Sequence, residues 1–228
     1  MTVAFFSTDK RQGNARAPGA LPRLLKRRGS PTAAATAEQV HGCRLAVVPR
    51  LQKPKKYPGV DGLLTDQPHQ PLAVFTADCV PLFLAAAHGN VVGLLHAGWR
   101  GVRGKILARA VLLMRRRWHL KPAGIRAWAG PAIGPCCFKV RGDVARYFPS
   151  TRRRQGYGGQ ARWKVDLVGE LRIQAKRLGI RWLVPRSFSG GGVRQKAFND
   201  CTMHGPRYFS YRRDKTHKRN VSVIYGIA

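Results

Sequence analysis

The chain has 228 residues, 44% of them hydrophobic, and its 42 basic and 10 acidic residues give a formal net charge of +32 at pH 7. This length and apolar content predict one folded domain over residues 1–228 and argue against a disordered chain. No run approaches the roughly 20 apolar residues of a membrane span, and residues 1–8 lack the apolar core of a signal peptide, so we expect a cytoplasmic protein without a membrane partner.

The basic residues are spread along the chain from Lys10 to Arg219 instead of forming one tail. This distribution favours compositional drift over a dedicated nucleic-acid site, although non-specific contact with nucleic acid is expected from the charge. The five cysteines are odd in number, and the adjacent pair Cys136-Cys137 cannot easily form a disulfide with itself. We therefore predict reduced thiols.

The first quarter of the chain contains short elements. We predict strands at Val3–Phe6 and Leu45–Val48, a basic helix at Leu21–Arg28, and a loop at Lys53–Gly59, which is rich in proline and lysine.

A β-hairpin follows. The apolar stretch Pro81–Ala87 is separated from the apolar stretch Val91–Leu95 by the turn signal His88-Gly89-Asn90. Cys79 precedes the first strand and His96 follows the second, so the two side chains are predicted to face each other across the open end of the hairpin.

Beyond Gly101 the apolar period changes to that of a helix. The predicted buried face consists of Val102, Ile106, Leu107, Ala110, Val111 and Met114. Further strands are predicted at Ile125–Ala129, at Ile180–Val184, where apolar residues alternate, at Tyr208–Arg213 and at Val221–Ile227. A helix is predicted between its cap Asp166 and its stop Gly179. The remaining predictions are a shaped loop at Ile133–Phe138, an exposed insertion at Arg152–Gln160 and a flexible segment at Ser189–Gly192. Many short strands with few helices, in no regular alternation, favour an α+β fold with largely antiparallel or mixed sheets.

A third candidate ligand joins Cys79 and His96. His41 lies in a corner before a strand, next to Gly42. Two imidazoles and a thiolate suit zinc, with copper as the alternative, and three protein ligands leave one tetrahedral position open, as in catalytic zinc sites. Cys79 paired with a histidine is also the arrangement of a metal-free cysteine nucleophile.

Two other residues lie close to these candidates in the sequence. Arg100 follows His96 in the same corner, where a guanidinium and free backbone N–H groups would suit a phosphate or oxyanion. Asp78 either orients a metal ligand or is a turn residue that bonds its own backbone.

Seven motifs in order resemble one family. They are Gln39-Val40-His41-Gly42, Asp61-Gly62-Leu63-Leu64-Thr65, Ala77-Asp78-Cys79-Val80-Pro81, His96-Ala97-Gly98-Trp99-Arg100-Gly101, Gly130-Pro131-Ala132-Ile133-Gly134-Pro135-Cys136-Cys137-Phe138, Cys201-Thr202 and Phe209-Ser210-Tyr211-Arg212-Arg213-Asp214. The pattern is similar to that of the YfiH-like family, also called the laccase-domain or polyphenol oxidase family and later assigned as purine nucleoside phosphorylases.

This resemblance implies a zinc ion held by His41, Cys79 and His96, which would be the catalytic residues. It also implies phosphorolysis of adenosine, inosine, guanosine and methylthioadenosine, with adenosine deamination as a side activity, and an α+β fold with central sheets and outer helices. The expected partners are purine nucleosides and phosphate, Arg100 is the candidate substrate-binding residue, and a monomer is expected. Copper-dependent phenol oxidation and non-catalytic nucleic-acid binding are the competing hypotheses; a copper oxidase would require ligands beyond these three.

Overall fold

The computed structural model describes residues 2–155, 162–184 and 201–227. In this part of the chain the strands form three sheets. The first has the order β1 (Thr2–Ser7), β14 (Asn220–Ile227), β6 (Leu72–Thr76), β2 (Ala35–Ala37) and β4 (Lys55–Tyr57). The second has the order β13 (Arg181–Trp182), β9 (Ile125–Ala129), β7 (Val80–Ala86), β8 (Val92–Ala97), β5 (Gly62–Thr65) and β3 (Leu45–Val47). The third has the order β10 (Lys139–Val140), β12 (Arg162–Val165) and β11 (Arg152–Gln155).

The helices are α1 (Ala20–Arg27), α2 (Trp99–Arg103), α3 (Ile106–Trp118), α4 (Gly142–Ala145), α5 (Leu167–Arg177) and α6 (Tyr211–Asp214), with short 3-10 turns at Lys10–Gln12 and Pro122–Gly124. None of the helices in the described ranges is long and apolar enough to cross a membrane.

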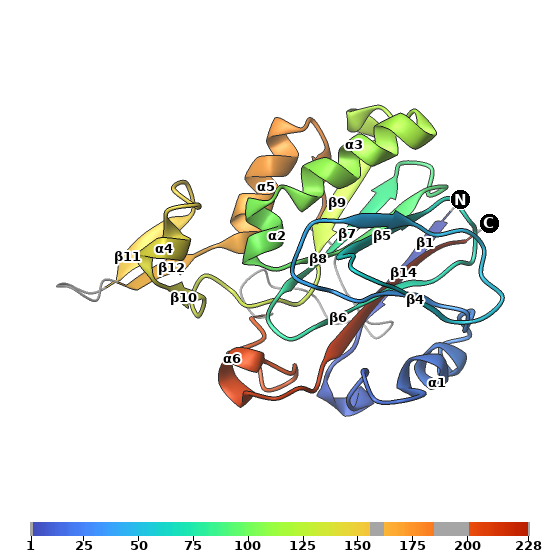
Figure 1. The fold of residues 1–228 in the computed structure, drawn as a ribbon, viewed down its shortest axis with the longest axis horizontal. Coiled ribbons are helices and arrows are strands. Elements are labelled where there is room, and N and C mark those ends of the chain that lie inside the picture. Colours follow the sequence, from blue (N-terminus) through green and yellow to red (C-terminus); the bar gives the residue numbers. More distant parts are fainter. Residues whose placement is uncertain (1, 156–161, 185–200, 228) are drawn as a thin grey trace.

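The two large sheets lie in the middle of the molecule and helices cover their outer faces, as predicted (Figure 1). Strand β7 is buried on both faces, which explains its continuous apolar sequence. Leu82 and Leu84 pack toward α3 and α5, whereas Phe83 packs between the sheets with Trp128 and Ile224. Helix α1 covers the far face of the five-stranded sheet through Leu25.

The sheets are mixed. Strand β2 is parallel to both β4 and β6, β3 is parallel to β5, and β13 is parallel to β9, while the remaining pairs are antiparallel. The α+β prediction is therefore confirmed. Strand β1 pairs along its whole length with β14, from Thr2 opposite Ile227 to Ser7 opposite Ser222, which brings the described ends of the chain together (Figure 1).

The predicted hairpin is confirmed as β7 and β8, which pair antiparallel. The predicted helical face after Gly101 is buried, but it belongs to two helices. Helix α2 ends at Arg103 with Gly104 as its C-cap, and Lys105 has a left-handed φ of +60°, which a continuous helix cannot contain.

Three local predictions need correction. Lys53–Gly59 is not only a loop, because residues 55–57 form β4. This basic strand lies at the edge of the sheet and pairs with β2. Arg152–Gln160 is not simply an exposed insertion, because residues 152–155 form β11 and pair with β12. The rest of that segment and Ser189–Gly192 lie outside the described residues.

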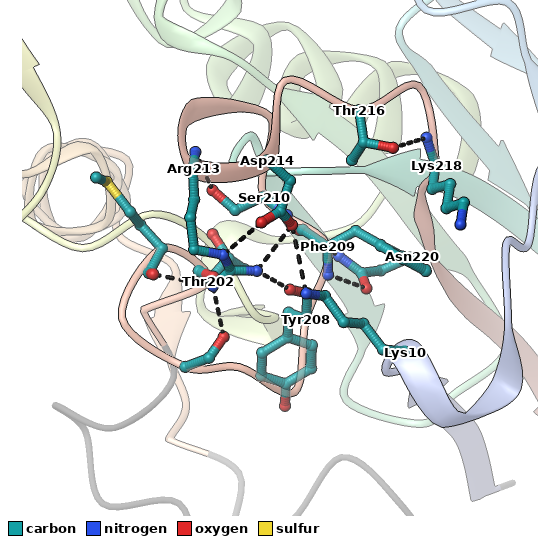
Figure 2. Close-up of polar contacts among 12 residues, drawn as sticks. Lys10, Thr202, Tyr208, Phe209, Ser210, Arg213, Asp214, Thr216, Lys218 and Asn220 are labelled. Carbon is teal, nitrogen blue, oxygen red and sulfur yellow. Dashed lines mark hydrogen bonds and ion pairs between the residues drawn. The ribbon is translucent and has the colours of Figure 1, made fainter.

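The third correction concerns Tyr208–Arg213, which is not a strand. The chain turns into α6, whose first residue follows the N-cap Ser210; the hydroxyl of Ser210 accepts a hydrogen bond from the Arg213 amide at 3.2 Å. The Ser210 amide donates in turn to the Asp214 carboxylate at 3.3 Å. These reciprocal capping bonds favour a helical turn over the predicted strand (Figure 2).

Candidate metal centre

The structure brings together the three predicted ligands His41, Cys79 and His96. One potential ligand atom from each lies within 4.8 Å of the others. His96 comes from β8, and Cys79 comes from the residue before β7. Strand pairing places His96 opposite Pro81, so the open end of the hairpin holds the Cys79 and His96 side chains together.

The three side chains differ in their access to solvent. His96 is buried with only 3% of its surface exposed, Cys79 is partly buried, and His41 is exposed. His41 occupies a left-handed conformation with φ of +59°, and its ring centroid lies 4.8 Å from that of His96. The cluster thus runs from the core to the surface, and a ligand can approach it from the His41 side.

Asp61 supports both histidines. Its carboxylate is fully buried and lies 2.9 Å from Nδ1 of His96. The same carboxylate accepts backbone hydrogen bonds from His41 at 2.9 Å and Gly42 at 2.7 Å. Since Asp61 occupies Nδ1 of His96, Nε2 is left to face the cluster, which is the usual arrangement behind a metal-bound histidine.

The sequence analysis did not identify Asp61 as a site residue. Its position follows from the pairing of β5 with β8, which aligns Gly62 with Leu95 and therefore sets Asp61 beside His96. A strand prediction for Gly62–Thr65 would have supplied that signal, because the residue before it would then lie next to the end of the hairpin.

Asp78 bonds to residues distant in sequence. It has a left-handed φ of +91°, and its carboxylate accepts hydrogen bonds from the Thr202 hydroxyl at 2.7 Å and the Arg212 amide at 2.6 Å. These bonds offset the cost of an unfavourable backbone conformation just before Cys79. Asp78 therefore fixes the corner from which Cys79 points, through residues distant in sequence.

Gly98 is a second residue that the sequence analysis did not assign to the site. A Cβ atom at this position would lie 3.2 Å from Sγ of Cys79 and 3.2 Å from Nδ1 of His41. The backbone passes so close to the ligands that only glycine leaves the cluster open.

Cys79 and His96 shift each other's pKa. Burial by itself raises the pKa of the Cys79 thiol, but the imidazoles of His96 and His41 outweigh it and bring the pKa to about 6. Burial by itself lowers the pKa of His96, but Cys79 and Asp61 outweigh it and raise the pKa to about 9. The protein thus stabilises a thiolate at neutral pH, which is the form that binds a metal.

The residues fit a metal ion by their chemistry. Two imidazoles and a thiolate are borderline-soft donors of the kind found in zinc and copper sites, and a buried carboxylate orients one of the imidazoles. Arg100 lies nearby on α2, two residues after Gly98. Its exposed guanidinium is positioned 4.7 Å from the ring centroid of Trp99.

Comparisons with known proteins identify the family and support the fold. A family model described as multi-copper polyphenol oxidoreductase laccase matches residues 11–226. A purine nucleoside phosphorylase of Xylella fastidiosa strain Temecula1 is 34% identical over 213 residues, covering 89% of this chain and 76% of the relative. The purine nucleoside phosphorylase YlmD of Geobacillus stearothermophilus is 44% identical over 192 residues, covering 78% of this chain and 66% of the relative.

Solved structures of similar proteins have the same fold. The crystal structure of YlmD from Geobacillus stearothermophilus superposes with a TM-score of 0.75 at 30% identity, covering 92% of this chain and 79% of that one. The hypothetical protein YfiH of Bacillus licheniformis superposes with a TM-score of 0.79 at 25% identity, covering 99% of this chain and 93% of that one.

Proposed function

This chain belongs to the multi-copper polyphenol oxidoreductase laccase family, whose members include YfiH and YlmD, and on that premise we propose that it is a zinc-dependent purine nucleoside phosphorylase. The proposal rests on one observation, the convergence of the His41, Cys79 and His96 ligand atoms within 4.8 Å. We infer the reaction from the names of the relatives, and we infer its location from the three side chains.

Phosphorolysis joins a phosphate oxygen to the anomeric carbon of ribose while the bond from that carbon to the purine nitrogen breaks. The products are ribose 1-phosphate and the free base, which takes up a proton. Positive charge develops on the ribose in such reactions, so the enzyme must hold an anion beside the sugar. A zinc ion bound by the three ligands supplies Lewis acidity, which stabilises negative charge on an oxygen of phosphate or water.

The protein's own residues position these groups. Asp61 fixes the orientation of His96, Asp78 fixes the corner before Cys79, and Gly98 keeps side-chain atoms out of the cluster. We assign Arg100 to phosphate binding, because it lies two residues from Gly98 and carries a permanent positive charge. The net charge of +32 also raises the local concentration of phosphate.

The test uses the full chain with inosine and inorganic phosphate. We expect equal amounts of hypoxanthine and ribose 1-phosphate, with neither product when phosphate is omitted. Cys79→Ala should abolish turnover, whereas Cys43→Ala, which removes another free thiol outside the cluster, should preserve it. Absence of turnover with inosine, adenosine, guanosine and methylthioadenosine, or full turnover in Cys79→Ala, would refute the proposal.

Adenosine deamination is the second activity that we propose for the same site. Water replaces the amino group of the purine, and the products are inosine and ammonia. The reaction needs no phosphate, so ammonia release from adenosine in phosphate-free buffer measures it separately. Loss of this activity in Cys79→Ala would place it in the same cluster.

The description of the family model supports one other candidate, copper-dependent phenol oxidation. Two imidazoles and a thiolate also bind copper, but multi-copper oxidation requires several metal ions with further ligands. Metal analysis of the purified protein separates the candidates. Zinc that Cys79→Ala loses by one equivalent, with no phenol oxidation, supports the phosphorylase, whereas bound copper with phenol oxidation supports the oxidase.

A further inference from the structure

A second cluster of potential metal ligands lies outside the site described above. We propose that it binds a second zinc ion in a closed structural site. The ligands are Cys136, Cys137, Cys201 and His204.

The chain brings the four side chains together from two loops. The first loop lies between β9 and β10 and carries the vicinal cysteines. The second carries Cys201, which forms a parallel bridge with Ala132, and Thr202 donates a backbone hydrogen bond to Ala132 at 3.0 Å. All four potential ligand atoms lie within 4.8 Å of one another, and Sγ of Cys136 is 3.4 Å from Nδ1 of His204.

The donor set and the distances suit zinc. Three thiolates and one imidazole are one of the common ligand sets of closed, four-coordinate structural zinc sites. With ordinary zinc–ligand bonds, a tetrahedral site separates a sulfur from a nitrogen by about 3.6 Å and two sulfurs by about 3.8 Å. The distance from Sγ of Cys136 to Nδ1 of His204 is close to the first value. None of the separations among the four ligand atoms exceeds the second value by more than about an ångström.

The backbone around Cys201 has the geometry of a metal-binding turn. Cys201 and His204 are separated by two residues, a spacing typical of zinc ligands that share one turn. The Gly134 amide donates a hydrogen bond to Sγ of Cys201 at 3.2 Å. Such bonds orient a thiolate ligand and are independent of the side-chain cluster itself.

Arg213 holds this turn rigid. Its guanidinium donates to the backbone carbonyls of Thr202 at 3.0 Å, Met203 at 2.9 Å and Gly205 at 2.9 Å, so it bonds to most of the turn that links Cys201 to His204 (Figure 2). It also donates to the Tyr208 carbonyl at 2.7 Å. The second loop is therefore fixed before any ion binds, which lowers the entropic cost of binding.

The surrounding charge favours a thiolate-bound ion. The cluster opens into a cavity of about 720 Å³, and the described residues that line it include no carboxylate. Its basic lining residues are Lys139, Arg141, Arg162, Arg212 and Arg213. Zinc with three thiolates and a neutral imidazole has a net charge of −1, so the basic wall stabilises the complete site. The same wall disfavours a hard cation that carboxylates or waters would have to hold.

The experiment counts zinc in the full chain purified with a reductant, by native mass spectrometry. We expect two zinc ions in the wild type and one in His41→Ala, because that variant retains only the second site. His204→Ala changes an exposed side chain, so it should fold, and a mild chelator should remove its second zinc at least tenfold faster than from the wild type. His204→Cys should restore slow release.

Cobalt substitution provides a readout that is independent of stability. In His41→Ala the sulfur-to-cobalt charge-transfer band should have the intensity of three thiolates, whereas the cluster at Cys79 offers one. The proposal is overturned if His41→Ala retains no zinc or if His204→Ala releases zinc as slowly as the wild type. Neither of these outcomes depends on phosphorolysis, so this proposal and the proposed function can fail separately.

Discussion

The carboxylate of Asp61 lies 2.9 Å from Nδ1 of His96, and both side chains are buried. The same carboxylate bonds to the backbone amides of His41 and Gly42, so one acidic residue sets the position of two of the three candidate ligands. Although burial acts to raise the pKa of Asp61, its hydrogen bonds to His96 and to the two amides lower it below its usual value. Asp61 is therefore an anion that stabilises the cluster.

Asp61→Asn should weaken metal binding or activity by about 10- to 100-fold. The amide keeps the size of the side chain but loses its charge, and it can offer His96 a donor where the imidazole needs an acceptor. The measurement is zinc affinity by competition with a chelator. Asp66→Asn is the matched control, because Asp61 precedes β5 and Asp66 follows it. The Asp66 carboxylate accepts a hydrogen bond from Nε1 of Trp118 at 2.9 Å, away from the cluster. Equal affinity in Asp61→Asn and the wild type would contradict this role.

The convergence of the candidate ligands could be predicted from the sequence because a hairpin is a local signal. The predicted stretches Pro81–Ala87 and Val91–Leu95 are apolar and separated by a turn, and this is sufficient to place Cys79 near His96. His41 joined them as a histidine in a glycine-flanked corner, and the family resemblance pointed to the same residue. The fold class followed equally from the pattern of short strands.

The supporting residues could not be predicted, since they depend on pairings between distant segments. Asp61 reaches His96 only because β5 pairs with β8, and Thr202 reaches Asp78 across 124 positions of sequence. The helical turn at Tyr211–Asp214 is also decided by side-chain bonds, of Ser210 and Arg213, that no periodicity reveals. Arg100 remains a prediction, as do the monomeric state and the cytoplasmic location.

Gly98→Ala should reduce metal binding while leaving the fold intact. The new Cβ would lie 3.2 Å from both Sγ of Cys79 and Nδ1 of His41, closer than ordinary van der Waals contact, whereas the φ of −70° at this position is allowed for alanine. Zinc content and circular dichroism should be measured together. Gly124→Ala, where the new Cβ meets nothing within 4 Å, controls for the substitution itself. A Gly98→Ala protein that binds zinc normally would show that the backbone does not crowd the ligands.

Thr202→Val should destabilise the protein by about 1–3 kcal/mol, because it removes the hydroxyl that donates to the Asp78 carboxylate and leaves that oxygen without its protein donor. Urea unfolding measures the change. Thr151→Val is the contrasting control: the Thr151 hydroxyl is buried and has no hydrogen-bond partner among the described residues, so its replacement should be neutral or stabilising. Similar losses in the two variants would argue against a specific role for the Asp78–Thr202 bond.

Asp214 should make the stability of the protein depend on pH. Its hydrogen bond to Arg213 lowers the pKa of the carboxyl well below its usual range, and burial opposes the shift only in part. A lowered folded-state pKa stabilises the protein above the unfolded pKa of about 3.9, and this stabilisation is lost as the pH falls toward the folded value. The difference in unfolding free energy between the wild type and Asp214→Asn should therefore be constant near neutrality and shrink below about pH 4.

The control for that experiment is Asp143→Asn, which introduces the same amide at an exposed carboxyl of α4. Urea denaturation at several pH values gives both curves. If the difference in unfolding free energy between the wild type and Asp214→Asn grew on acidification, its sign would be wrong for a lowered pKa of Asp214. That result would contradict the assignment.

The account depends most on a divalent ion at His41, Cys79 and His96, and chelation followed by reconstitution tests it directly. Ribose 1-phosphate formation from inosine should be measured before metal removal, after removal, and after enough zinc is returned to fill both proposed sites. We predict activity that disappears with the metal and returns with zinc, and that does not return in Cys79→Ala. Full activity in the metal-free protein would contradict the account and would favour Cys79 acting as a nucleophile in its own right.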